Sequence, residues 1–291
     1  MQMMLSSAYA FFAVTAAGCL LAAASGESAR VGTDRLSALT LAALAATLAA
    51  AAAVVGQFGR PSLLFSVFSN PGTAIFRELA SLLLALVAGV AYFAVLWTGA
   101  KRRTGRIVSI CAALSGLLLA LALGSSTVQP WRPVWNTWTL VLPAAGFAAL
   151  SGAAITMMLA ASEYRRERAD GPAMRAILTA ENKAEGKPEG MAARFRTILL
   201  AAASAPIAGL VLYFVAVSSD AAARSALVSL WTGDRACLFW AGVVAPSVLP
   251  ALLVALRMPN GLNRCPMIGL MVALLAALAA GAWQHLVLGL A

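Results

Sequence analysis

Eight long apolar segments, separated by short polar connections, dominate this sequence of 291 residues. Each segment has about 18 or more residues, which is enough for a helix to cross the hydrocarbon core of a bilayer. Charged residues make up only 11% of the chain, whereas soluble proteins carry roughly a quarter. We therefore expect an all-α integral membrane protein, a helical bundle of eight transmembrane helices that forms a single polytopic domain over residues 1–291. The predicted spans are Leu5–Ser25, Arg35–Gly56, Thr73–Trp97, Gly105–Gly124, Asn136–Ser162, Arg196–Val217, Cys237–Leu256 and Cys265–Leu286.

The distribution of lysine and arginine predicts which helix ends face the cytoplasm. Sixteen of the 21 basic residues lie in the connections after the first, third, fifth and seventh segments, including the charged loop at residues 163–195. Because basic residues concentrate in cytoplasmic loops, we expect a cytoplasmic (inner) membrane protein with both termini outside. No basic residue precedes the first segment, unlike a signal peptide, so we expect this segment to remain as a helix. The second and eighth segments are rich in alanine, which permits close packing, and we expect them inside the bundle.

Composition also argues against several classes of ligand. The net charge of +10 does not indicate nucleic-acid binding, because the basic residues lie in membrane connections rather than on one face. His285 is the only histidine, so the chain cannot supply the two histidine ligands of a b-type haem. The four cysteines lie far apart without Cys-x-x-Cys spacing. We therefore expect no haem and no metal in this chain.

The stretch from Gln57 to Ser81 is unusually polar for its position between the second and third predicted helices. Glu78 is followed by an uncharged run that continues to Lys101, which places its carboxylate near the start of a membrane helix. A carboxylate in that position is costly, so Glu78 is a candidate functional residue. The alternative is an acid in the first helical turn, stabilised by the helix dipole or by pairing with Arg60 or Arg77.

Three short motifs resemble those of a known family of membrane proteins. The first is Gln57-Phe58-Gly59-Arg60-Pro61. The second consists of two short stretches, Ser69-Asn70 and Arg77-Glu78-Leu79. The third is Pro133-Val134-Trp135-Asn136-Thr137. Together with eight helices and both termini outside, they are similar to the membrane anchor subunits of dimethyl sulfoxide reductase. The membrane subunits of polysulfide and nitrite reductases resemble the chain more distantly. The architectural likeness covers the whole chain, and the matching residues cover a small part of it.

The resemblance implies the haem-free anchor subunit of a molybdopterin oxidoreductase complex of anaerobic respiration. In this family the anchor binds and oxidises menaquinol or another quinol at the outer face of the membrane. A ferredoxin-like iron–sulfur subunit with four clusters and a molybdopterin catalytic subunit dock against that face. The terminal reductase site then lies on another subunit, so this sequence identifies neither the terminal electron acceptor nor the quinone.

The resemblance also implies roles for individual residues. The family glutamate that is essential for quinol oxidation falls on Glu78, which we expect to be the catalytic base. The family histidine falls on Gln57, whose amide can hydrogen-bond a quinone oxygen but cannot accept a proton at neutral pH. We therefore expect one base rather than two. The other predicted quinol-site residues are Asn136 for orienting the ring oxygens, Trp135 for packing on the ring or on a partner subunit, and Arg60 and Arg77 for modulating the carboxylate.

Two other classes of function stay open at this point. A secondary transporter or permease places polar residues or broken helices near the middle of the bilayer, whereas the middle stretches here are nearly all Ala, Leu, Val and Gly. A purely structural anchor is the second alternative, with Glu78 serving only at the helix start. The response of quinol oxidation to substitution of Glu78 tests the structural anchor, and substrate flux in vesicles without partner subunits tests the transporter.

Overall fold

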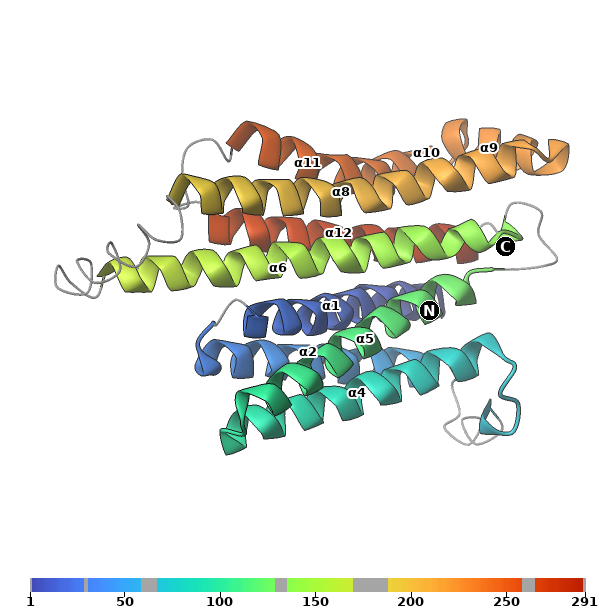
Figure 1. Ribbon diagram of the computed structural model, residues 1–291. Helices are drawn as coiled ribbons and strands as arrows, with labels where there is room; N and C mark the ends of the chain where they lie inside the picture. Colours follow the sequence, from blue (N-terminus) through green and yellow to red (C-terminus); the bar gives the residue numbers. More distant parts are fainter. Residues whose placement is uncertain are drawn as a thin grey trace.

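The structure is a bundle of long helices joined by short connections (Figure 1). The computed structural model describes residues 2–28, 31–58, 67–128, 135–169, 188–257 and 265–289, and no strand occurs in these ranges. The helices are α1 (Gln2–Ser28), α2 (Thr33–Phe58), α4 (Ala74–Thr98), α5 (Arg102–Ser126), α6 (Val141–Ala169), α8 (Pro188–Ser218), α9 (Ala221–Thr232), α10 (Ala236–Phe239), α11 (Ala245–Arg257) and α12 (Cys265–Gly289). The 3-10 turn η2 (Trp138–Leu140) leads into α6, and the π-helical segment η3 (Trp240–Val244) joins α10 to α11.

Eight helical spans in the described part of the chain are long and apolar enough to cross a membrane. They are Met3–Glu27, Thr33–Gln57, Ala74–Thr98, Arg103–Ser126, Trp138–Ser162, Arg196–Ser218, Ala236–Leu253 and Met267–Val287. Their limits agree with the predicted spans to within a few residues, so the prediction of an all-α membrane bundle with eight long helices is confirmed. The short helix α9, which lies between the sixth and seventh spans, is not predicted from the sequence.

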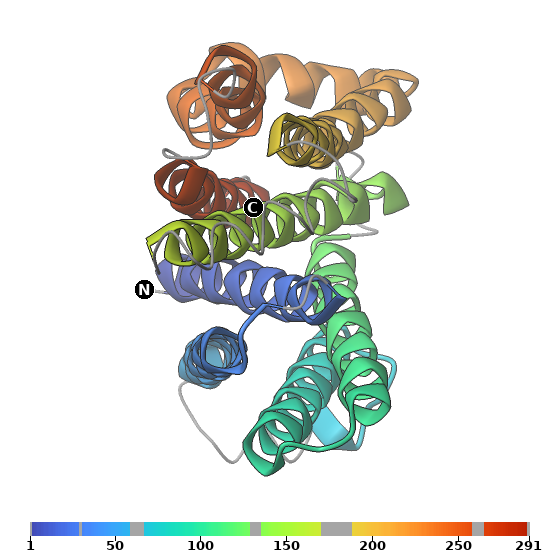
Figure 2. The ribbon, with the colours of Figure 1, turned by 60° about the vertical axis from the view of Figure 1, so that its left-hand side comes forward.

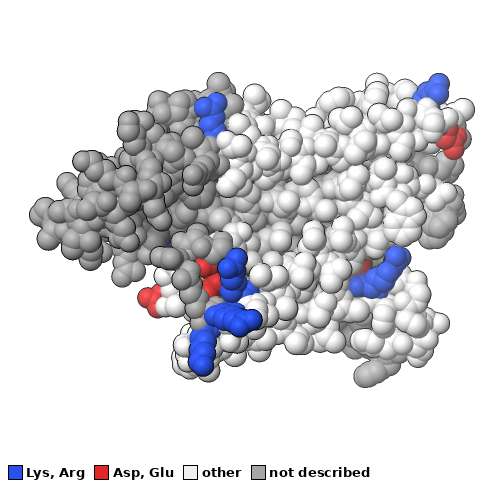
Figure 3. Space-filling view, in the orientation of Figure 1, with Lys and Arg blue, Asp and Glu red and all other residues white. Residues whose placement is uncertain are grey.

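Successive spans run in opposite directions, so both chain ends lie at one end of the bundle (Figure 1). We call this the terminal end, and the other the opposite end. Basic residues whose side chains the structure describes are Arg35, Lys101, Arg103, Arg106 and Arg196 at the opposite end, and Arg77, Arg224 and Arg235 at the terminal end. On the face in Figure 3, a broad belt without charged side chains separates the charged ends. The belt is consistent with a bilayer between the two ends, and the placement of the terminal end outside stays a prediction.

Helix α1 lies in the middle of the bundle, where it packs against α2, α5, α6 and α12. Figure 2 shows α6 and α12 on one side of α1, and α2, α4 and α5 on the other. The spans of α1 and α6 are the most buried of the eight, and that of α12 is also mostly buried. Less than half of the α2 span is buried. The expectation that alanine-rich helices lie inside is therefore met by α12 and not by α2.

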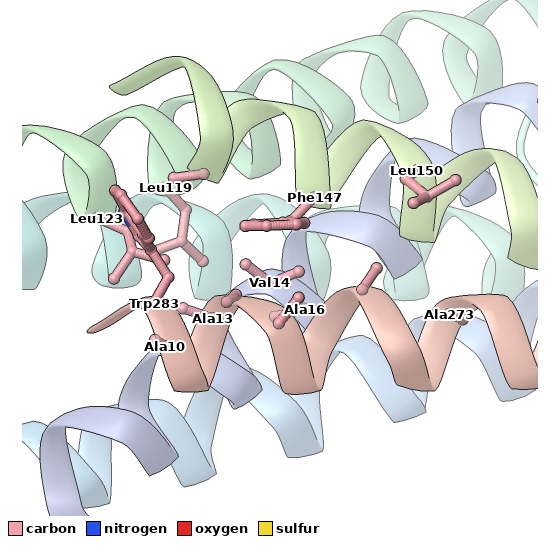
Figure 4. Close-up of a cluster of buried hydrophobic side chains, with 14 of the residues drawn as sticks. Ala10, Ala13, Val14, Ala16, Leu119, Leu123, Phe147, Leu150, Ala273 and Trp283 are labelled. Carbon is pink, nitrogen blue, oxygen red and sulfur yellow. The ribbon is translucent and has the colours of Figure 1, made fainter. Parts of the chain in front are cut away.

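Apolar side chains fill the region where α1, α5, α6 and α12 meet (Figure 4). Val14 of α1, Leu119 of α5, Phe147 of α6 and Trp283 of α12 all belong to one buried cluster. Lipid chains are as apolar as these residues, so the helices gain little from excluding water. The gain comes instead from dense van der Waals contact between complementary helix faces.

Glycines mark the closest helix crossings. A side-chain carbon added to Gly146 of α6 would lie 2.6 Å from the backbone nitrogen of Pro206 in α8. One added to Gly269 of α12 would lie 2.6 Å from the carbonyl oxygen of Ala154 in α6. These distances are too short for any side chain, so the backbones themselves are in contact at both places. Alanine is too large for these crossings, which explains why alanine content alone did not identify the inner helices.

We predict that Gly146→Ala destabilises the protein. The new methyl group meets the backbone of Pro206, so α6 and α8 must move apart, and such overpacking costs about 1–3 kcal/mol. Thermal unfolding of the detergent-solubilised protein measures the change. Gly56→Ala is the matched control, because its added carbon would lie 3.4 Å from Leu5 Cδ1, an ordinary contact. Equal unfolding temperatures for the two variants would contradict the close crossing.

Candidate functional site

Glu78 occupies the second turn of α4 and is buried, with 8% of its surface exposed. The helix begins after Thr73, whose hydroxyl accepts a hydrogen bond from the backbone N–H of Phe76 at 3.2 Å. From this start, the helical period turns Glu78, Ser81 and Leu82 toward the bundle interior. The first turn of α4 contains no acidic residue. The alternative of a first-turn acid is therefore not met, because Thr73 is the cap and Glu78 lies further along the helix.

Residues from α1, α4 and α5 surround the carboxyl group of Glu78. The side chain of Ser126, the last residue of α5, hydrogen-bonds the carboxyl group. Tyr9 of α1 and Arg77 of α4 lie close enough to interact with it electrostatically. Tyr9 is buried and Arg77 is exposed. The carboxyl group therefore lies at the junction of three helices at the terminal end, between the buried core and the surface.

An open groove of about 580 Å³ lies beside Glu78, on the surface between α4, α5 and the start of α6. Arg77, the residue directly before Glu78, lines this groove, and so does Ser81, which follows Glu78 by about one helical turn. The remaining lining residues are Phe76, Ala80, Leu84, Leu118, Leu121, Ala122, Ser125, Trp138 and Val141. The volume is within the usual range for small-molecule sites. Because the lining is mostly apolar and several of its side chains are exposed, the groove suits an apolar ligand.

The predicted site residues of the first motif lie only partly within the described structure. Gln57 is half-buried in the last turn of α2, which ends at the terminal end. The preceding residue, Gly56, lies next to Leu5 of α1, one helical turn before Tyr9. Gln57 therefore shares an end of the bundle with Glu78, and its hydrogen bond to a quinone oxygen stays a prediction. Arg60 lies outside the described residues.

Trp135 belongs to an aromatic cluster on the other side of η2 from the groove. Its ring stacks on Tyr213 of α8, with centroids 5.8 Å apart and planes 9° from parallel. The ring of Trp283 in α12 meets it edge-on at 5.7 Å. Only 1% of the Trp135 surface is exposed. These contacts occupy the indole, so they favour a structural role, and its predicted packing on a quinone ring stays untested.

Asn136 and Trp138 lie on the exposed side of the same segment. Asn136 is exposed, and Trp138, two residues later, is 68% exposed and lines the groove. Of the residues predicted for the site, only Arg77 lines the groove, and Glu78 is buried beside it without lining it. Asn136 does not line the groove either, although it precedes Trp138 by two residues. Trp138, which directly follows the motif Pro133–Thr137, is the aromatic residue that this segment contributes to the groove wall.

Sequence reasoning missed three residues around Glu78, namely Tyr9, Ser126 and Trp138. Tyr9 and Ser126 lie in the terminal-end turns of their helices, where serine and tyrosine are common in membrane proteins and carry little signal alone. Trp138 carries the same ambiguity, because tryptophans often anchor helices at the membrane interface. Their proximity to Glu78 depends on which helix faces meet, which no local pattern reveals.

No group of three His, Cys, Asp or Glu residues comes together as metal ligands within the described ranges. His285 instead contacts α1, with its Nδ1 3.3 Å from the hydroxyl of Ser7. Comparison of the sequence with protein-family models and with curated proteins found no match. The function of the chain is therefore inferred from its site geometry and its sequence motifs.

We predict that Trp135→Ala lowers the free energy of unfolding by about 3–5 kcal/mol, because it removes a buried ring from the aromatic cluster. Trp138→Ala is the matched control, since its ring is mostly exposed, and it should change stability little. Chemical denaturation in detergent measures both variants. If Trp135→Ala kept full stability and lost binding of a quinol analogue, Trp135 would be a ligand-binding residue instead.

Proposed function

We propose that this chain is the haem-free membrane anchor subunit of a dimethyl sulfoxide reductase-type molybdopterin oxidoreductase complex, and that it oxidises a quinol in the groove beside Glu78. The observation that carries the proposal is a buried carboxyl group next to an open, mostly apolar surface groove of about 580 Å³. A quinol such as menaquinol travels within the bilayer and must lose its hydroxyl protons when it is oxidised. It therefore needs an entrance from lipid and a proton acceptor, and this site combines both.

The groove offers complementary contacts for both parts of a quinol. Phe76, Leu118 and Trp138 supply apolar and aromatic surface for the ring. The hydroxyls of Ser81 and Ser125 donate to the carbonyls of Glu78 and Ala122 in their own helices, at 2.9 Å each. Each serine oxygen keeps lone pairs that can accept a hydrogen bond from a quinol hydroxyl.

The last turn of α5 connects the groove with the proton acceptor. Ser125 lines the groove, and the next residue, Ser126, hydrogen-bonds the carboxyl group of Glu78. The ionised carboxylate accepts a quinol hydroxyl proton as general base. Arg77, exposed at the groove, favours the negative charge that the carboxylate carries before this step.

Oxidation of one quinol to quinone releases two protons and two electrons. Each proton passes to Glu78 and then to the aqueous phase at the terminal end, so the single base acts twice per turnover. A partner subunit docked at that end would hold the iron–sulfur cluster that accepts the two electrons. Protons and electrons leave on the same side, so this reaction moves no charge across the membrane.

We predict that Glu78→Gln abolishes quinol-dependent reduction by the assembled complex, with a loss of at least about 100-fold, because the amide cannot accept a proton. Reduced menadione supplied to membranes provides the assay. Co-purification of an iron–sulfur and a molybdenum subunit reports assembly, which should be unchanged. Glu27→Gln, in the last turn of α1 at the opposite end, is the matched control and should keep full turnover.

Normal turnover in Glu78→Gln would remove this residue from the mechanism and favour a purely structural anchor. Purification of the chain alone and stable, together with flux of a solute into vesicles that contain only this chain, would favour a transporter.

We also predict that Ala122→Trp weakens binding of a fluorescent quinol analogue by at least tenfold. Ala122 lines the groove, and an indole at this position fills part of the space that the quinol ring needs. Leu114→Trp is the matched control, because Leu114 lies on an exposed face of α5 outside the groove lining. Equal affinities of the two variants would place the quinol site elsewhere.

A further inference from the structure

The hydroxyl of Tyr9 is buried without a hydrogen-bond partner in the described structure, and 1% of the residue is exposed. Burial of an unpaired hydroxyl is costly, and most such groups in native proteins are paired. Glu78 lies close enough to Tyr9 for the two groups to interact electrostatically. Tyr9 does not line the groove, so it approaches Glu78 from the core, on the α1 side.

The hydroxyl of Ser126 is shared between Glu78 and the backbone of its own helix. Its hydroxyl also donates to the backbone carbonyl of Leu123 at 2.8 Å, and a hydroxyl has only one proton to donate. A protonated Glu78 can donate to the oxygen of Ser126 while Ser126 continues to donate to Leu123. An ionised Glu78 only accepts hydrogen bonds, so it competes with Leu123 for the single proton of Ser126.

We propose that Tyr9 is a positioning residue for Glu78, whose hydroxyl donates a hydrogen bond to the ionised carboxylate before that carboxylate accepts the quinol proton. This inference rests on the proposed function. Hydrogen bonds from a neutral donor to a charged acceptor are stronger than those between neutral groups, so Tyr9 stabilises the form of Glu78 that acts as a base. After proton transfer, the neutral carboxyl group donates to the oxygen of Ser126, and the Tyr9 hydroxyl is unpaired again.

The two sets of partners give the carboxyl group a different arrangement before and after it takes a proton. Tyr9 holds the ionised group from the core side, and Ser126 holds the neutral group from the last turn of α5. Loss of the proton at the terminal end restores the bond to Tyr9 and prepares the site for the second proton of the same quinol.

Tyr9→Phe tests the proposal, because it removes the hydroxyl and keeps the buried ring. In the complete complex in membranes, with reduced menadione as substrate, we expect kcat to fall about tenfold and KM to stay unchanged. The matched control is Tyr92→Phe. The hydroxyl of Tyr92 is also buried beside a carboxylate, and it donates to Glu27 Oε2 at 3.1 Å at the opposite end of α4. This control should leave both kinetic constants unchanged.

Infrared difference spectroscopy gives a readout that a loss of packing would not produce. The carboxylate bands of Glu78 are identified by their disappearance in Glu78→Gln. They should shift in Tyr9→Phe, because the carboxylate loses a donor, and stay in place in Tyr92→Phe. Unchanged kcat and unchanged bands in Tyr9→Phe would overturn the role of Tyr9, and the proposed function would stand if Glu78→Gln were still inactive. Full turnover in Glu78→Gln would overturn both.

Discussion

Close contact between helix backbones is the constraint on which the rest of this structure depends. In lipid, helices gain little from burying apolar side chains, so they must fit each other closely enough for dispersion forces to hold them. The crossings of α6 with α8 and of α6 with α12 achieve this at Gly146 and Gly269, where no side chain separates the backbones. The central position of α1 follows from such packing, and it brings Tyr9 beside Glu78 of α4.

The position of Glu78 near a helix end gives its carboxyl group polar neighbours within an apolar bundle. It lies one turn inside the end of α4, where Ser126, Tyr9 and Arg77 supply polar neighbours from three helices. A carboxylate in the middle of the same helix would have none of these helix-end neighbours. The same location puts it beside the mostly apolar surface groove in which we propose that the quinol binds.

The sequence predicts the spans well and the surroundings of the site poorly, for a physical reason. Bilayer thickness sets the length of each apolar run, so hydropathy alone locates Ala74–Thr98 and its neighbours. The cost of a charge in lipid likewise singles out Glu78 from its own segment. Tyr9 and Ser126 join it only through the packing of α1 and α5 against α4, and Trp135 turns into the core while Trp138 faces the groove. These outcomes depend on the relative rotation of whole helices, which a single segment does not encode.

Because residue 57 is a glutamine, Glu78 is the single base in the proposed site. In the family that the motifs resemble, a histidine stands at this position. The amide of glutamine cannot accept a proton at neutral pH as a histidine can. On the proposed function, a single carboxylate accepts both protons of each quinol in succession and returns to its ionised form between them. Return requires that the ionised form have a partner of its own, since an ionised group left unpaired in this setting is strongly disfavoured. Tyr9, with an unpaired hydroxyl near Glu78, meets that requirement from a helix that the motifs do not include. On the proposed function, the hydrogen-bond donor from α1 is what allows Glu78 to serve as the single base of the site.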